Sequence, residues 1–227
     1  MFIRLVAILF PFLLTLNYFV LLADAPASVQ KTAYTVGKVI QFALPVFWVG
    51  YICKERFWIH TFSKRGLFLG AAFGMVVAAM MLITYFAFLS QSGNVLAPDS
   101  PARQAVVGKM QGLGIVDGRI WLLLGVFYSV IHSGLEEYYW RWFVYRKLSC
   151  SAIVASAGFT LHHIILVGTY FGYASPYCVL CSLGVFLGGL FWCYLYRWSN
   201  SIWGAWLGHG IIDAAIFAIG YFISINV

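Results

Sequence analysis

Two adjacent glutamates, Glu136 and Glu137, interrupt an apolar run that is long enough to cross a lipid bilayer. Residues 120–135 form the first part of this run, and residues 138–145 continue it with one further charge, Arg141. A charged side chain near the centre of a bilayer costs on the order of 3 kcal/mol on insertion scales. Such side chains face a protein interior or a water-filled cavity, and they commonly mark a functional site. The pair therefore predicts a membrane helix with chemistry on its buried face.

The composition predicts an all-α, polytopic membrane helix bundle. Hydrophobic residues make up 63% of the 227 and charged residues only 9%, whereas a soluble domain carries about 25% charged residues. The chain cannot bury this much apolar surface within itself, so we expect the lipid bilayer to be its solvent. Each expected span is close to the ~20 residues that a membrane helix needs. The expected spans are residues 3–23, 36–53, 66–90, 119–145, 151–171, 176–196 and 201–224.

No domain boundary is visible, so we expect a single membrane domain over residues 1–227, with a catalytic core at about 119–224. The one long connection, residues 91–118, is rich in Gly and Pro and is expected to be a re-entrant or interfacial segment. The first span is expected to be retained. Its apolar stretch is longer than that of a signal peptide, and Pro26 would follow the cleavage site directly.

The distribution of basic residues predicts the orientation of the chain. The net charge of +7 is scattered over short connections, which indicates topology determinants and lipid contacts and predicts no nucleic-acid partner. Eight basic residues fall at alternate ends of the spans, at positions 4, 54, 56, 64, 65, 146, 147 and 197. Five fall at the opposite ends, at positions 31, 38, 103, 109 and 119. The positive-inside rule therefore predicts a cytoplasmic N-terminus. We expect a multi-pass protein of the plasma (inner) membrane.

Three groups of ionisable residues are expected at one depth. With this topology, Glu136, His163 and His209 all lie roughly 12–18 Å inside the membrane from the same side, at 1.5 Å per residue. Residues four apart share a helix face, so Glu137 can pair with Arg141. Glu136 and Glu137 differ by about 100° around the helix, so they cannot do the same job.

The same spacing recurs on the later spans. His209 and Asp213 are four apart and can face one cavity, and Phe159 and His163 repeat the interval. The resulting motifs are EExxxR at 136–141, FxxxH at 159–163 and HxxxD at 209–213. In this order, on successive apolar spans, they resemble the three motifs of the CPBP intramembrane proteases, also called Abi, which include the CAAX prenyl endopeptidases. The resemblance covers roughly residues 120–220.

The resemblance implies an intramembrane endopeptidase that hydrolyses a peptide bond of a membrane-associated protein or peptide. Glu136 would activate water together with His163, and His209 with Asp213 would stabilise the oxyanion or orient the water. The expected supporting residues are Glu137, Arg141, Phe159 and His162. Well-known CAAX enzymes have Asn where this chain has Asp213. Because His162 and His163 are adjacent, only Phe159 indicates which of them is the histidine of the second motif.

A metal-free, glutamic-type mechanism is favoured, because the motifs lack the HExxH spacing that places two imidazoles on one helical turn. If zinc is present, its ligands are expected to be His163, His209 and Glu136. Two other functions remain open. Buried Glu, His and Asp also serve membrane transporters and proton relays, and a non-catalytic immunity or scaffold relative would keep a relict site.

Overall fold

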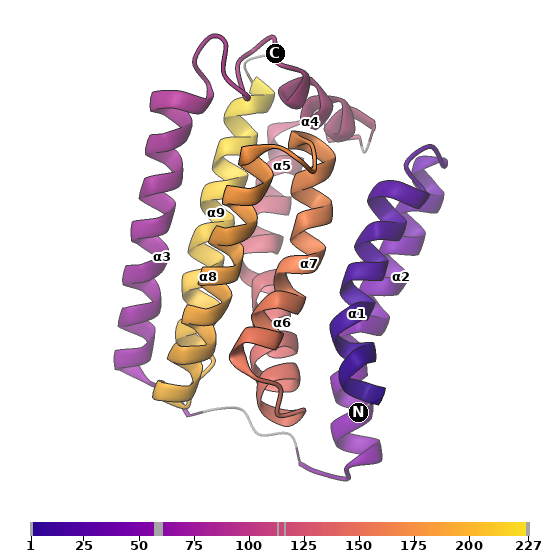
Figure 1. Ribbon diagram of the computed structural model, residues 1–227, viewed down its shortest axis with the longest axis vertical. Helices are drawn as coiled ribbons and strands as arrows, with labels where there is room; N and C mark the ends of the chain where they lie inside the picture. Colours follow the sequence, from indigo (N-terminus) through magenta and orange to yellow (C-terminus); the bar gives the residue numbers. More distant parts are fainter. Residues whose placement is uncertain (1, 57–60, 113, 116, 226–227) are drawn as a thin grey trace. The chain divides into compact units, whose positions relative to one another are not determined.

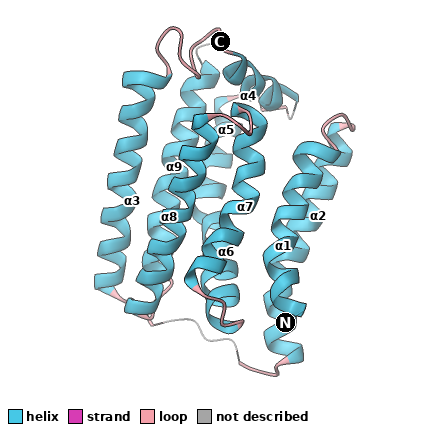
Figure 2. Cartoon of the chain, in the orientation of Figure 1, coloured by secondary structure: helices cyan, strands magenta, loops and turns pink. Residues whose placement is uncertain are grey.

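The computed structural model describes residues 2–56, 61–112, 114–115 and 117–225. Within them every regular element is helical and no strand occurs (Figure 2), which confirms the all-α prediction. Seven helices in the described part of the chain are long and apolar enough to cross a membrane. They are Phe2–Leu21, Ala27–Ile52, Lys64–Leu89, Gly118–Lys147, Ala152–Phe171, Pro176–Ser199 and Trp203–Ser224. The chain is therefore a multi-pass membrane protein.

The predicted boundaries agree with these spans to within a few residues, except at the second span. That helix begins at Ala27 rather than at residue 36, directly after Pro26. Gln30, Lys31 and Lys38 lower the hydropathy of its first half, so the apolar pattern alone places its start too late. The prediction that Lys38 lies at the outer end of a span was consequently wrong, because it lies well inside this helix.

The described residues cluster into two compact units, each built from two stretches of sequence, and the two are described separately. Unit 1 comprises Met1–Phe62 and Leu135–Ile202. Its elements are α1 (Phe2–Leu16), η1 (Asn17–Leu21), α2 (Ala27–Val46), η2 (Phe47–Ile52), η5 (Tyr138–Lys147), α7 (Ala152–Phe171) and α8 (Pro176–Ser199), where η denotes wider π-helical turns. The short helix α6 (Ser133–Glu137) contains the boundary between the units.

The helices of unit 1 begin and end at residues with the expected chemistry. Ser151 caps α7 by accepting a hydrogen bond from the amide of Val154 at 3.2 Å, and Ser175 caps α8 through Cys178 at 3.1 Å. Gly172 ends α7 at a φ of 84°, a conformation that glycine adopts without strain. Because these ends are fixed locally, the residues in the middle of α7 face a defined direction.

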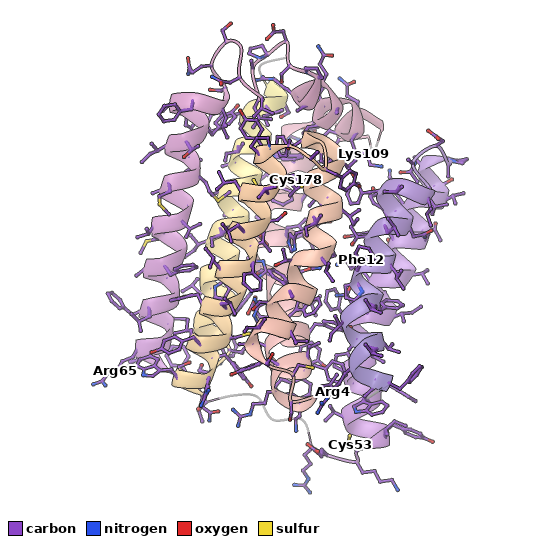
Figure 3. The ribbon with its side chains drawn as sticks, in the orientation of Figure 1. Arg4, Phe12, Cys53, Arg65, Lys109 and Cys178 are labelled. Atoms are coloured by element: carbon purple, nitrogen blue, oxygen red, sulfur yellow. The ribbon has the colours of Figure 1, made fainter. Side chains whose placement is uncertain are left out.

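Unit 1 buries aromatic side chains around α1, α7 and η5. The Tyr139 hydroxyl donates to the carbonyl oxygen of Ala7 at 2.7 Å, and both residues are fully buried. Helix α1 lies beside α2 and α7, and α7 packs along α8 (Figure 1). Within this unit Arg4 and Cys53 lie at one end and Cys178 at the other (Figure 3).

Unit 2 comprises Ser63–Gly134 and Trp203–Val227. Its elements are α3 (Lys64–Thr84), η3 (Tyr85–Leu89), α4 (Pro101–Gly112), α5 (Gly118–Val126), η4 (Phe127–His132) and α9 (Trp203–Ile225). Helix α3 lies along α9 (Figure 1) at a separation that only glycine allows. A Cβ atom on Gly74 would lie 2.6 Å from the carbonyl oxygen of Gly208, as close packing of small residues at four-residue spacing predicts.

The connection expected to be re-entrant or interfacial contains α4. The Arg103 side chain is 3% exposed and donates to the carbonyl oxygen of Ile223 at 3.0 Å, so α4 is attached to the C-terminal end of α9. With 12 residues, α4 is too short to cross a bilayer. Arg65 and Lys109 lie at opposite ends of unit 2 (Figure 3). Whether this segment enters the membrane stays a prediction.

Candidate active site

Glu136 lies among basic side chains inside unit 1. It sits on α6 and is 3% exposed. Its Oε1 atom is 3.5 Å from Nε2 of His162 on α7 and 3.7 Å from Nζ of Lys38 on α2. Three elements that are distant in the sequence therefore bring a carboxylate, an imidazole and an ammonium to one point. A buried carboxylate needs such partners, because an ion without compensation is costly in an apolar interior.

The two adjacent histidines of α7 occupy different positions. His162 is buried, with its ring parallel to that of Trp140 at a centroid distance of 5.9 Å. His163 is less buried, and its Nδ1 lies 2.8 Å from the carbonyl oxygen of Phe159. A carbonyl oxygen only accepts, so Nδ1 carries the proton and Nε2 of a neutral ring keeps its lone pair.

One ligand atom from each of Glu136, His162 and His163 lies within 4.8 Å of the other two. Such a cluster can exchange protons with a bound water, and its donor set is also one that zinc accepts. The sequence placed His163 beside the carboxylate and His162 in a supporting position. The structure brings both imidazoles to Glu136, with the His162 contact at 3.5 Å.

The neighbouring carboxylate, Glu137, has a different partner. Its Oε1 atom accepts a hydrogen bond from Arg141 at 2.9 Å, and the two side chains are 0% and 1% exposed. The predicted pairing four residues apart is therefore confirmed. The guanidinium carbon of Arg141 lies 4.6 Å from the ring centroid of Phe159 and 5.0 Å from that of Trp192. These contacts give Phe159 a physical role, because its ring face attracts the buried cation.

The third motif lies on α9 in unit 2. Nε2 of His209 is 3.6 Å from Oδ1 of Asp213, and His209 is buried. The prediction that these two residues share one face is confirmed. An aspartate at this distance can orient the imidazole. That His209 and Asp213 form one site together with Glu136 stays a prediction.

Sequence reasoning missed Lys38 as a member of the site. Its Nζ lies 5.6 Å from the ring centroid of Tyr34 and 5.4 Å from that of Phe42, one helical turn to either side. The signal was present in the sequence, since aromatic residues at both four-residue positions mark one face of a helix. A lysine on that face, inside a spanning helix, indicates a buried acidic partner.

Comparison with known proteins supplies the remaining observation. Residues 118–215 match the family model described as "Type II CAAX prenyl endopeptidase Rce1-like". Residues 118–215 form an Rce1-like domain. The match includes all three motifs and confirms the family resemblance, and it leaves Lys38 outside. No curated protein and no solved structure matches the chain. The Rce1-like domain supports an intramembrane endopeptidase as the general class of this protein.

Proposed function

We propose that this protein hydrolyses a peptide bond in a membrane-associated protein or peptide by means of a water molecule that Glu136 activates. The observation that carries the proposal is the buried Glu136 carboxylate with His162 and His163 around it, inside the Rce1-like domain. The matched family model is described as a CAAX prenyl endopeptidase, and a prenylated, lipid-anchored tail is the substrate class that we propose here.

In the proposed reaction, Glu136 removes a proton from the water as the oxygen attacks the scissile carbonyl carbon. The carbonyl oxygen becomes an oxyanion, and His209, oriented by Asp213, donates to it. The C–N bond then breaks, and the proton held by Glu136 or by an adjacent imidazole passes to the departing nitrogen. Glu137 and Arg141 stay outside this transfer and fix the helix that carries Glu136.

The test is cleavage of a prenylated peptide with a CAAX end by the purified protein in lipid vesicles. Glu136→Gln keeps the shape of the side chain and removes its basicity, so we expect turnover to fall by about 10²–10⁴-fold. Asp99→Asn, an exposed acidic residue on the 91–100 loop, serves as the matched control and should retain the wild-type rate. Wild-type turnover by the Glu136→Gln variant would refute the proposed mechanism.

We further propose that the reaction uses no metal. The Glu136, His162 and His163 cluster would offer zinc three ligands, a set that differs from the His163, His209 and Glu136 set expected from the sequence. The Lys38 ammonium lies 3.7 Å from the same carboxylate oxygen, and its charge would oppose a divalent cation there. Elemental analysis of active protein checks this proposal. About one zinc per chain, with activity lost to a chelator and restored by zinc, would overturn it.

For orientation, we propose a cytoplasmic N-terminus in the inner membrane. Removing Lys38 from the connection charges leaves four basic residues at the outer ends against eight at the inner ends, which favours this orientation more strongly. Single cysteines in a background without the native ones test it. Asn94→Cys should react with an impermeant maleimide in intact cells and Lys64→Cys should not, because both positions are exposed and lie at opposite ends of the span Lys64–Leu89. The opposite labelling would reverse the topology.

A further inference from the structure

We infer that Lys38 is a positioning residue for Glu136, holding its carboxylate in place and balancing its charge from outside the Rce1-like domain. The inference rests on the proposed function, in which Glu136 is the base. Lys38 lies on α2, and residues 118–215 contain no part of that helix. The site would therefore need the N-terminal part of the chain as well as the segment that carries the three motifs.

Lys38 lies deep within its helix. It lies eleven residues after Ala27, which places it about 16 Å along the helix at 1.5 Å per residue. A lysine near the end of a membrane helix extends its ammonium to the lipid headgroups. Lys38 is too deep to do so, and its side chain is only 12% exposed. Its charge must be compensated inside the protein.

Neighbouring side chains fix the Lys38 ammonium. The rings of Tyr34 and Phe42 lie 5.6 and 5.4 Å from Nζ, on the turns before and after Lys38. Two aromatic faces attract the cation and limit the rotation of the flexible lysine chain. The ammonium is thereby held 3.7 Å from the Oε1 atom of Glu136.

Lys38 also completes the charge balance of the two glutamates. Glu137 has the Arg141 guanidinium at 2.9 Å, and Glu136 has the Lys38 ammonium at 3.7 Å. Each carboxylate on the α6–η5 segment thus has one cation close to it. Lys38 thus compensates the charge of Glu136 as Arg141 compensates that of Glu137.

Lys38 and His162 both approach the Oε1 atom of Glu136. Two contacts from different helices restrict the rotation of the carboxylate, and a general base is effective only within hydrogen-bond reach of the water it deprotonates. A misplacement of about 1 Å in an active site can cost about 10²-fold in rate. Lys38 therefore affects catalysis through Glu136 and makes no contribution to substrate affinity.

The experiment compares Lys38→Met and Lys38→Arg with the wild type in the vesicle assay with the prenylated peptide. Lys38→Met keeps the length of the side chain and removes the charge, so kcat should fall by about 10²-fold with KM unchanged. Lys38→Arg should restore a substantial part of kcat. Lys31→Met, an exposed lysine on the same helix, is the matched control and should behave as wild type.

A wild-type kcat for Lys38→Met would overturn the inference while leaving the proposed function intact. A raised KM with unchanged kcat would also overturn it, because Lys38 would then bind substrate. A double-mutant cycle of Lys38→Met with Glu136→Gln, read as stability in detergent, adds a measurement that needs no activity. Non-additive stabilities support the contact and additive ones overturn the inference. If the wild type cleaves nothing, the proposed function fails separately, and the cycle still decides whether Lys38 and Glu136 are coupled.

Discussion

Glu136 and Glu137 are adjacent in the sequence and almost equally buried, yet their surroundings differ in kind. Glu137 accepts a 2.9 Å hydrogen bond from Arg141, whose guanidinium is covered by the rings of Phe159 and Trp192. Glu136 lies 3.5 Å from the His162 imidazole and 3.7 Å from the Lys38 ammonium, both on other helices. The Glu137 centre (Glu137, Arg141, Phe159 and Trp192) is thus built on an ion pair between residues four apart in the sequence. The Glu136 centre (Glu136, Lys38 and His162) depends on contacts between α6, α2 and α7.

This difference separates structural from chemical roles. A carboxylate with a short, charge-assisted hydrogen bond in a fully buried pair has its charge compensated and no access to water. A carboxylate with longer contacts to an imidazole and an ammonium can still bind a water and accept its proton. The comparison predicts that changes at the Glu137 centre mainly affect stability, whereas changes at the Glu136 centre mainly affect turnover.

The largest effect on stability is expected from Arg141→Ala. Removing the guanidinium leaves Glu137 as a buried charge without its partner, which costs about 3–5 kcal/mol of unfolding free energy. Glu136→Gln is the matched variant at the other centre and should cost less than about 2 kcal/mol, because the amide keeps the shape of the side chain and its oxygen can still face the Lys38 ammonium, a contact that at 3.7 Å is longer than a hydrogen bond. Unfolding in detergent titrated with SDS measures both variants. Equal losses would show that the two glutamates play the same structural role and would break the comparison.

A smaller effect is expected from Arg141→Lys. The ammonium keeps the positive charge, but it has neither the planar fork that binds a carboxylate nor the flat face that stacks on the two rings. The expected loss is about 2 kcal/mol, near that of a hydrogen bond to a charged group. The same SDS titration measures it. A loss as large as that of Arg141→Ala would show that geometry, rather than charge, stabilises Glu137.

Much of the fold could be predicted because its determinants are local. The apolar runs fix the seven spans, and helix geometry places residues four apart on one face, so Glu137 with Arg141 and His209 with Asp213 were both paired correctly. The start of α2 was missed because its polar residues lower the hydropathy, although Gln30 and Lys38 are largely buried by the protein.

The Lys38 contact could not be predicted from the spacing of residues. Lys38 and Glu136 lie on different helices, and which helices become neighbours depends on packing over the whole unit. The two histidines raise a similar problem, because residues adjacent on a helix point about 100° apart and the pattern does not say which faces Glu136. The structure brings both to the carboxylate through the position of α7.

The smallest effect that sharpens the comparison is expected from Phe159→Leu. The ring of Phe159 lies 4.6 Å from the Arg141 guanidinium carbon, and leucine would fill similar space without a negative ring face. A buried cation–π contact is worth about 0.5–2 kcal/mol, so the unfolding free energy should fall by about 1 kcal/mol. Phe171→Leu, on the same helix with its ring 6.3 Å from that of Tyr177, is the matched control for the loss of an aromatic residue.

If the two variants lose the same stability, the ring face of Phe159 contributes nothing specific to Arg141. If Phe159→Leu loses more and Arg141→Ala removes the excess in the double variant, the second motif supports the glutamate pair through this contact. The phenylalanine of FxxxH would then stabilise the Glu137 centre, while the histidine of the same motif serves the Glu136 centre.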